Sequence, residues 1–284
     1  SDDDNRADVD ERPRTIRKKP RNKTILSLYG PVQFDTSSNY YVAAVEPPSS
    51  NVAEMSGVAM GLLGILREAT ADRLNGINTV AMIVDSRIAM FKTGTALRDL
   101  ETALQRTSHQ TRLVGTAGLC AELIVRLSQL NIAVKWVWVK GHAEVQGNEA
   151  ADSGATRGKQ GEEQAMQPQT VIRAHDDQRR RQMEPMTKAA AALKELQADA
   201  EHARQHPDED QMGTEEDYER WIKRDQDRLE ELKTAWERRR ESEQAVLEQS
   251  RIAIREATIR CRQIDARTRL AIARAKERQA EHND

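Results

Sequence analysis

A histidine and an aspartate ten residues apart are the side chains in this chain best suited to chemistry. His142 and Asp152 lie in the segment WVKGHAEVQGNEAADS, which covers residues 138–153. An imidazole can transfer a proton near neutral pH, and a carboxylate can hold a metal ion or accept a proton. Both side chains must be brought together by the elements around them before this chemistry is possible.

The residues around this pair predict a strand followed by a helix. Residues 133–139 are short, β-branched and aromatic, as in a buried strand. Gly141 and Gly147 mark a loop, and Asn148 is a good N-cap for a helix that carries Asp152. We therefore expect the imidazole and the carboxylate to meet where the strand passes into the helix.

This segment resembles the last strand, histidine loop and last helix of type 1 ribonuclease H. The GH step, the GNE triplet and the AAD triplet occur in the order that the family has. Residues 49–66 resemble its first helix, with a catalytic glutamate at Glu54, and residues 82–90 resemble its fourth strand, with a catalytic aspartate at Asp85. The resemblance covers about residues 24–160 and is closest to the archaeal-type and retroelement-borne branches. It implies an α/β fold, an RNase H-like mixed sheet flanked by helices.

The resemblance also implies a chemistry, which is hydrolysis of the RNA strand of RNA–DNA hybrids. Glu54, Asp85 and Asp152 are implied to hold Mg²⁺ or Mn²⁺, and His142 is implied to assist proton transfer or product departure from a mobile loop. Phosphodiester hydrolysis needs a nucleophilic water and stabilised charge on the attacking and leaving oxygens. Two Mg²⁺ ions about 4 Å apart can supply both, and they favour oxygen ligands.

A fourth carboxylate, which the family places in its first strand, has two possible readings. In one, VQFDTSSN is that strand and Asp35 is the ligand, although only 19 residues then separate Asp35 from Glu54. In the other, residues 27–32 and 40–46 are the second and third strands, the first strand is absent, and Asp35 lies in a hairpin loop. The second reading implies a truncated or decayed enzyme, and the element lengths favour it.

The remaining elements of the middle of the chain follow from apolar periodicity. We expect strands at 26–32, 40–45 and 79–84, and helices at 51–70, 97–104 and 110–130. Helices and strands alternate in the manner of an α/β domain.

Composition divides the chain into four parts. Residues 1–23 form a charged arm that cannot order itself without a partner, residues 24–160 form the RNase H-like domain, and residues 161–214 form a linker with a short helix near 188–204. Residues 215–284 predict a long charged helix or weak coiled coil, about 100 Å long, or a single helix that frays or folds back. Because few large apolar residues share one face there, we expect this tail to be helical but separate from the domain.

Composition also limits the setting of the protein. Two cysteines in 284 residues give no disulfide framework, which suits a reducing, intracellular compartment, whether cytoplasmic, nuclear or organellar. No apolar run is long enough to span a membrane, and the net charge of −2 gives no overall attraction to nucleic acid.

Three functions remain open from the sequence. The chain could be a nuclease that acts on RNA–DNA hybrids and has a retroelement origin. It could instead be a non-catalytic binder of hybrid or double-stranded RNA. It could also be an assembly subunit that associates with itself or with other chains through its helical tail.

Overall fold

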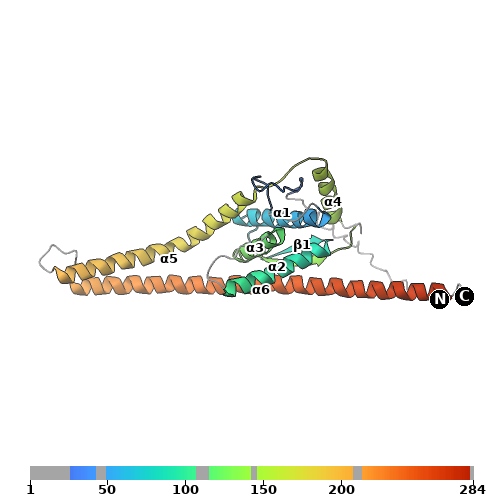
Figure 1. Ribbon diagram of the computed structural model, residues 1–284. Coiled ribbons are helices and arrows are strands. Elements are labelled where there is room, and N and C mark those ends of the chain that lie inside the picture. The colour runs from blue at the N-terminus through green and yellow to red at the C-terminus, as the bar shows by residue number, and fades with distance from the viewer. Residues whose placement is uncertain (1–25, 43–48, 107–114, 142–145, 207–212, 282–284) are drawn as a thin grey trace, which may run out of the picture.

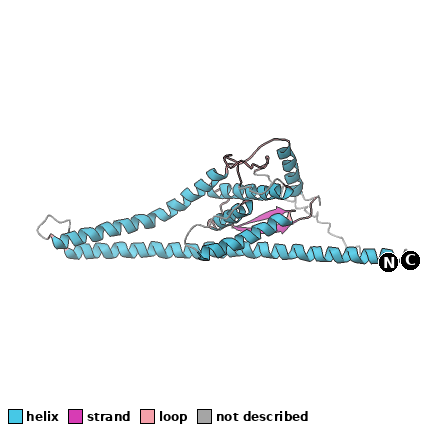
Figure 2. Ribbon diagram, viewed as in Figure 1, coloured by secondary structure: helices cyan, strands magenta, loops and turns pink. Residues whose placement is uncertain are grey.

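The computed structural model describes residues 26–42, 49–106, 115–141, 146–206 and 213–281. Its elements, in chain order, are α1 (Ser50–Thr70), β1 (Thr79–Val84), α2 (Arg87–Arg106), α3 (Thr116–Ser128), β2 (Ala133–Trp138), α4 (Gln146–Lys159), α5 (Pro168–Gln205) and α6 (Glu215–Glu281). Helices flank a short parallel sheet, and a long helix follows (Figures 1 and 2), which confirms the expected α/β class.

The two strands are parallel neighbours. They pair from Thr79 opposite Ala133 to Val84 opposite Trp138. Alternate side chains of each strand point to opposite faces of the sheet. One face, with Val84, Val134 and Trp136, is buried in the core, whereas the other leaves Ile83 51% and Val137 44% exposed. Because the strands are parallel, both carboxyl ends lie at the same end of the sheet.

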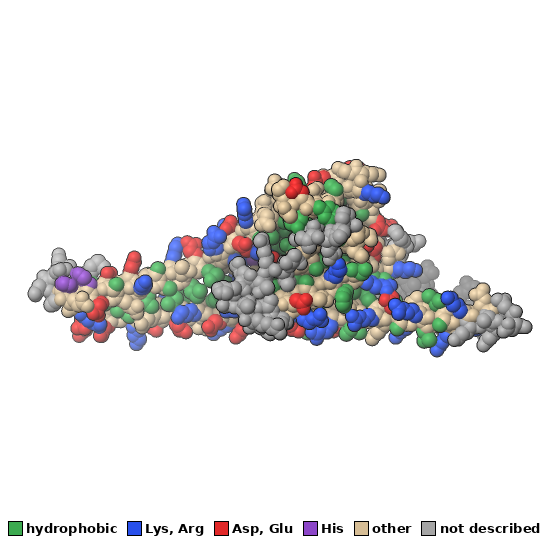
Figure 3. Space-filling model, in the orientation of Figure 1, with side chains coloured by type: hydrophobic (Ala, Val, Ile, Leu, Met, Phe, Trp, Pro, Cys, Tyr) green, Lys and Arg blue, Asp and Glu red, His purple; other side chains and the backbone are tan. Residues whose placement is uncertain are grey.

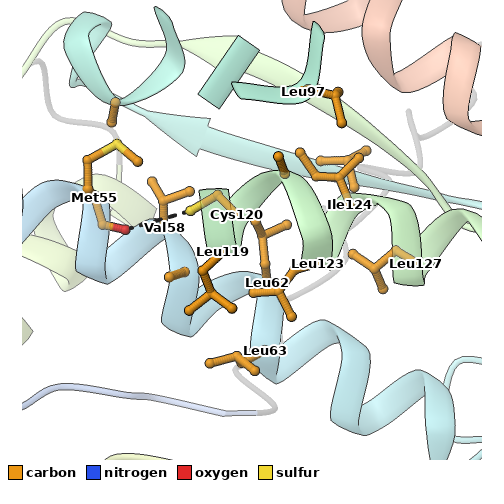
Figure 4. Close-up of a cluster of buried hydrophobic side chains, with 14 of the residues drawn as sticks. Met55, Val58, Leu62, Leu63, Leu97, Leu119, Cys120, Leu123, Ile124 and Leu127 are labelled. Atoms are coloured by element: carbon orange, nitrogen blue, oxygen red, sulfur yellow. Dashed lines mark hydrogen bonds between the residues drawn. The ribbon is translucent and has the colours of Figure 1, made fainter. Parts of the chain in front are cut away.

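The core lies where α1 and α3 pack against each other beside the buried face of the sheet (Figure 4). The apolar residues of α1 recur at spacings of three and four, so they form one face of a helix. The apolar residues of α1 and α3 with no exposed surface are Ala59, Leu62, Leu63, Leu66, Cys120, Ala121, Leu123, Ile124 and Leu127. At the start of α1, the Ser49 hydroxyl accepts a hydrogen bond from the Val52 amide and caps the helix.

The 67-residue helix α6 runs beside β2 and is part of the globule. Ala133 donates its backbone N–H toward β1, so the N–H of the next residue points to the other edge of β2. There the Ser250 hydroxyl accepts it at 2.9 Å. Ile254, Ala257 and Cys261 of α6 are also buried in the core. α6 therefore covers a strand edge that would otherwise expose unpaired backbone groups.

The position of α6 differs from the expectation of a tail separate from the domain. That expectation counts large apolar side chains, but the contact surface of α6 also uses small ones. Gly94 of α2 lies directly against Ile254, close enough that a Cβ there would approach the isoleucine to 3.4 Å. Small residues allow two helices to pack closely even when they carry few large apolar groups. Because these two helices are far apart in the sequence, no local sequence pattern predicts their contact.

The segment expected to be a linker also differs, because most of it forms the 38-residue helix α5. Pro185 lies inside α5 and removes one backbone donor, but the helix continues through it. α5 packs against α1 near its start and lies beside α6 toward its C-terminal end (Figure 1). Glu243 of α6 joins the two helices, since it accepts from Arg179 of α5 at 2.5 Å and from Arg239 at 2.9 Å.

The strands expected at 26–32 and 40–45 are not present within the part of those segments that the structure describes. Residues 26–42 contain one isolated antiparallel bridge, from Tyr29 to Gln164, and residues 43–45 lie outside the described ranges. Leu26 and Leu28 pack beside Gly64 of α1. Their apolar character therefore serves helix packing and does not extend the sheet.

The charged arm at residues 1–23 lies outside the described residues, so its separation from the domain remains a prediction. Among the helices that the structure describes, none is both long enough and apolar enough to cross a membrane.

One charged cluster closes the turn after α1 and predicts a pH dependence. Glu68, 8% exposed, accepts hydrogen bonds from Arg67 and Arg73, and these bonds lower its pKa from 4.5 to about 2, Arg73 contributing most. A carboxyl group whose pKa is lower in the folded state stabilises the fold at pH values above its unfolded-state pKa. This contribution is lost as the pH falls from 4.5 toward 2.

We therefore expect Glu68→Gln to lower the free energy of unfolding at pH 7 by about 1 kcal/mol, a modest value because both arginines are well exposed to solvent. The difference from the wild type should shrink as the pH falls below 4.5. Urea denaturation at several pH values measures both, with the exposed Glu219→Gln as control. A difference independent of pH would show that the ion pairs are not its source.

Candidate active site

Asp85 lies at the carboxyl end of β1, immediately before the turn into α2. The Trp138 indole N–H, at the end of β2, donates to the Asp85 backbone carbonyl at 2.9 Å. Ser86 precedes α2 and caps it, since its hydroxyl accepts a hydrogen bond from the Ala89 amide at 3.1 Å. Both bonds hold the backbone of Asp85 between the ends of two strands and the start of a helix. The position of its carboxylate is therefore set by the sheet.

Two residues from the segments that flank residues 142–145 in the sequence also reach Asp85. Asn148 of α4, only 7% exposed, donates its side-chain amide to Asp85 Oδ2 at 3.3 Å. Gly141, which follows β2, passes so near that a Cβ there would lie 3.2 Å from the same oxygen. The strand and the helix therefore meet around Asp85, and the expected meeting of His142 with Asp152 stays a prediction, because His142 lies outside the described residues. Asn148 lies inside α4 and contacts this carboxylate, rather than serving as the N-cap that the sequence predicts.

A cation that sequence reasoning missed lies at the same end of the sheet. The guanidinium of Arg87 lies 4.6 Å from the centre of the Trp138 ring and forms an ion pair with Asp265 of α6. Arg87 is two residues from Asp85 in sequence. Its partner is 178 residues away, so no local pattern could have indicated the pair. The contact fixes α6 at the end of the sheet where Asp85 lies.

The other predicted carboxylates are on elements that reach this end of the globule. Figure 1 shows the N-terminal end of α1, the carboxyl end of β1 and α4 at the same end. Glu54 is exposed near the start of α1. Asp152 is half-buried, four residues after Asn148, and so lies on the same face of α4. His142 lies outside the described residues.

These elements converge, but their carboxylates do not make a metal site by themselves. Among the residues that the structure describes, no three His, Cys, Asp or Glu side chains lie close enough together to hold a metal ion. The described donors therefore do not fit a divalent cation as they stand. The predicted ligand set of Glu54, Asp85 and Asp152 remains a prediction.

Asp35, the candidate for a first-strand carboxylate, lies in a turn. Its Oδ1 accepts hydrogen bonds from the Ser37 amide at 2.8 Å and from the Ser37 hydroxyl at 2.7 Å. The hydroxyl bond and then the amide bond lower the pKa of Asp35 below its usual value. An exposed carboxylate bonded to its own turn has a local structural role. The structure therefore does not place Asp35 in a strand.

Comparison with known proteins gives one match. A family model described as RNase H matches residues 18–160, which is half of the chain. No curated protein and no solved structure matches. The matched range contains the sheet, the core helices α1 and α3, and the convergence around Asp85, and it confirms the resemblance expected over residues 24–160. The chain belongs to the RNase H family.

Proposed function

We propose that this chain hydrolyses the RNA strand of RNA–DNA hybrids at the end of the sheet centred on Asp85. Family membership indicates hybrid binding and hybrid nuclease activity in general. The observation that carries the proposal is the contact of Asn148 with the Asp85 carboxylate. It brings the end of β1 and the last helix of the matched region to one carboxylate. Phosphodiester hydrolysis needs such a group, either to hold a cation or to accept a proton.

The cofactor that we propose is Mg²⁺ or Mn²⁺, because the RNase H family generally uses divalent metals. Asp85 is the ligand with the best structural support, and Glu54 and Asp152 would complete the set. The described side chains do not yet form such a group. A bound hybrid, with its phosphate oxygens, would add negative charge and oxygen ligands at this position. The role of His142 in proton transfer remains part of the same proposal.

A second function is favoured by the incomplete carboxylate group and by the turn that holds Asp35. In it, the chain binds hybrids without cleaving them and serves as a structural subunit. The α5–α6 hairpin, which extends far from the globule in Figure 1, would provide the contact with other chains or with a second copy. Origin in a retroelement and an intracellular location are compatible with both functions and remain proposals.

One experiment separates these functions. The full chain is incubated with a hybrid labelled on the RNA strand, with Mg²⁺, with Mn²⁺ or with EDTA, and binding is measured in parallel by fluorescence anisotropy. Hydrolysis is expected only with a divalent metal. Binding without hydrolysis under every condition would support the second function. Undiminished hydrolysis in EDTA would contradict the proposed cofactor, and absence of both binding and hydrolysis would contradict both functions.

The close passage of Gly141 beside Asp85 gives a further prediction. A Cβ at Gly141 would press on Asp85 Oδ2 and displace the carboxylate by a few tenths of an ångström. Because catalysis is sensitive to small misplacements, Gly141→Ala is expected to lower the hydrolysis rate about three- to tenfold. Gly147→Ala is the matched control, since a Cβ there meets nothing within 4 Å. Equal rates in the two variants, measured in single-turnover assays, would show that Asp85 is not constrained by this loop.

A further inference from the structure

The two parts of α6 differ in charge. Residues 215–254 hold twelve acidic and nine basic side chains, whereas residues 255–278 hold eight basic and three acidic ones. The chain as a whole has a net charge of −2, so this basic segment is a local feature. Figure 3 shows Lys and Arg side chains along this end of the helix. A basic stretch on one element is the electrostatic mark of a phosphate-binding surface.

Four of these basic residues form a row along the helix. Arg255, Arg262, Arg269 and Lys276 follow one another at intervals of seven residues, which is nearly two full turns. Their side chains therefore lie close to one line on the surface of α6, and all four are exposed. The row is about 32 Å long at 1.5 Å per residue. A duplex of that length carries about 19 phosphate charges. We call these four residues the basic row.

The basic row also differs in its partners from several basic residues earlier in α6. Those side chains pair with carboxylates of the same helix, as in Arg220–Asp217, Lys233–Glu230, Arg239–Glu243 and Arg251–Glu248. No member of the basic row forms an ion pair with a carboxylate that the structure describes. A cation that is not paired with a carboxylate is available to attract a phosphate.

The basic row faces the end of the globule that carries Asp85. Arg262 lies over the ring of Phe91 in α2, at 5.6 Å from its centre. Asp265, which is between Arg262 and Arg269 on the helix, pairs with Arg87 at the start of α2. Because Arg87 follows Asp85 by two residues, this part of α6 lies at the end of the sheet where the candidate active site is. Beyond it, α6 extends past the globule (Figure 1).

We propose that the basic row is a phosphate-binding surface that holds the backbone of a nucleic-acid duplex at the Asp85 end of the sheet. This inference rests on the proposed function, since it assigns the row to the same substrate. α6 lies wholly outside the matched residues 18–160, so membership of the RNase H family assigns it no role. The row supplies affinity that is independent of base sequence, and the site around Asp85 supplies the chemistry.

The test is hybrid binding by the full chain in EDTA, which separates binding from hydrolysis. A fluorescent RNA–DNA hybrid longer than the row is titrated at several KCl concentrations. The row variant carries Arg255→Gln, Arg269→Gln and Lys276→Gln, with Arg262 kept because it contacts Phe91. We expect the row variant to bind about 30-fold more weakly at low salt. The slope of log K against log salt should become shallower by about 3, or about 1 for each lost contact.

The control variant removes the same charge from another side of α6, through Arg267→Gln, Arg274→Gln and Arg278→Gln. It should retain most of the affinity and most of the salt slope. Equal losses in the two variants would overturn the assignment of the row, because net charge alone would then explain binding. Circular dichroism verifies that both variants keep the helix.

Other partners give different results. The proposal would be overturned if the wild type bound anionic lipid vesicles but not duplex. It would also be overturned if the row variant changed its sedimentation mass but bound duplex as well as the wild type does. The outcomes also distinguish this proposal from the proposed function. If the chain binds hybrids through the basic row but cleaves none, the assignment of the row stands and the proposed nuclease function fails. If the row variant hydrolyses hybrids as fast as the wild type, the nuclease function stands and the assignment of the row fails.

Discussion

Ile254→Asp is expected to lower the free energy of unfolding of the whole globule by about 4 kcal/mol. Ile254 is 3% exposed and lies against Gly94 of α2. The substitution removes a buried aliphatic side chain and places an unpaired carboxylate in the same space, and both effects destabilise. A loss of this size is a large part of the stability of a single domain. Urea denaturation followed by circular dichroism measures it.

Ile252→Asp provides the matched control. It makes the same chemical change two residues earlier in α6, where the isoleucine is 44% exposed. The expected effect is below about 1 kcal/mol, because the carboxylate stays in water. If both variants were as stable as the wild type, α6 would contribute no packing. The sequence-based expectation of a tail separate from residues 24–160 would then hold.

The sequence predicts the parts of the fold that depend on local patterns. Residues 79–84 and 133–139 are apolar and β-branched, and the structure has strands there with bounds within one residue. The helix expected at 51–70 begins and ends within one residue of α1 because its apolar spacing is regular and Ser49 caps it. Short-range side-chain types determine these elements almost completely.

The parts that the sequence did not predict depend on distant contacts. The hydrogen bond from Val134 to Ser250 joins residues 116 positions apart, and the ion pair of Arg179 with Glu243 joins residues 64 apart. Such contacts depend on how the helices pack against one another. Small residues permit this packing, but their presence in the sequence does not predict which helices will meet. Leu26 and Leu28 resemble strand residues for the same reason, since an apolar side chain can pack on a helix as well as extend a sheet.

The arrangement of the candidate site divides in the same way, and the roles of its residues stay predictions. Asp85 and the last helix meet as expected, because a carboxylate after a strand and a helix after the neighbouring parallel strand are brought to one end of the sheet. Two contacts had no signal in the sequence. Asn148 was expected to cap a helix and instead donates to the carboxylate, and Arg87 finds its partner on α6.

Asp85→Asn is expected to lower the rate of hybrid hydrolysis by about 100-fold or more while leaving the fold intact. The amide keeps the shape of the side chain and can still contact Asn148. The amide lacks the negative charge that would hold a cation and is too weak a base to accept a proton, and loss of such a group typically costs a factor of 10² to 10⁴. Hybrid binding should persist, because the basic row and the rest of the surface are unchanged.

The most direct test of the account is single-turnover cleavage of a labelled RNA–DNA hybrid by the wild type, Asp85→Asn and Asp99→Asn in the presence of Mn²⁺ or Mg²⁺. Asp99 is an exposed carboxylate on α2, and its loss removes the same charge away from the end of the sheet. We predict that the wild type and Asp99→Asn cleave at similar rates and that Asp85→Asn cleaves at least about 100-fold more slowly. Equal cleavage by all three proteins would contradict the assignment of Asp85 as the centre of the active site.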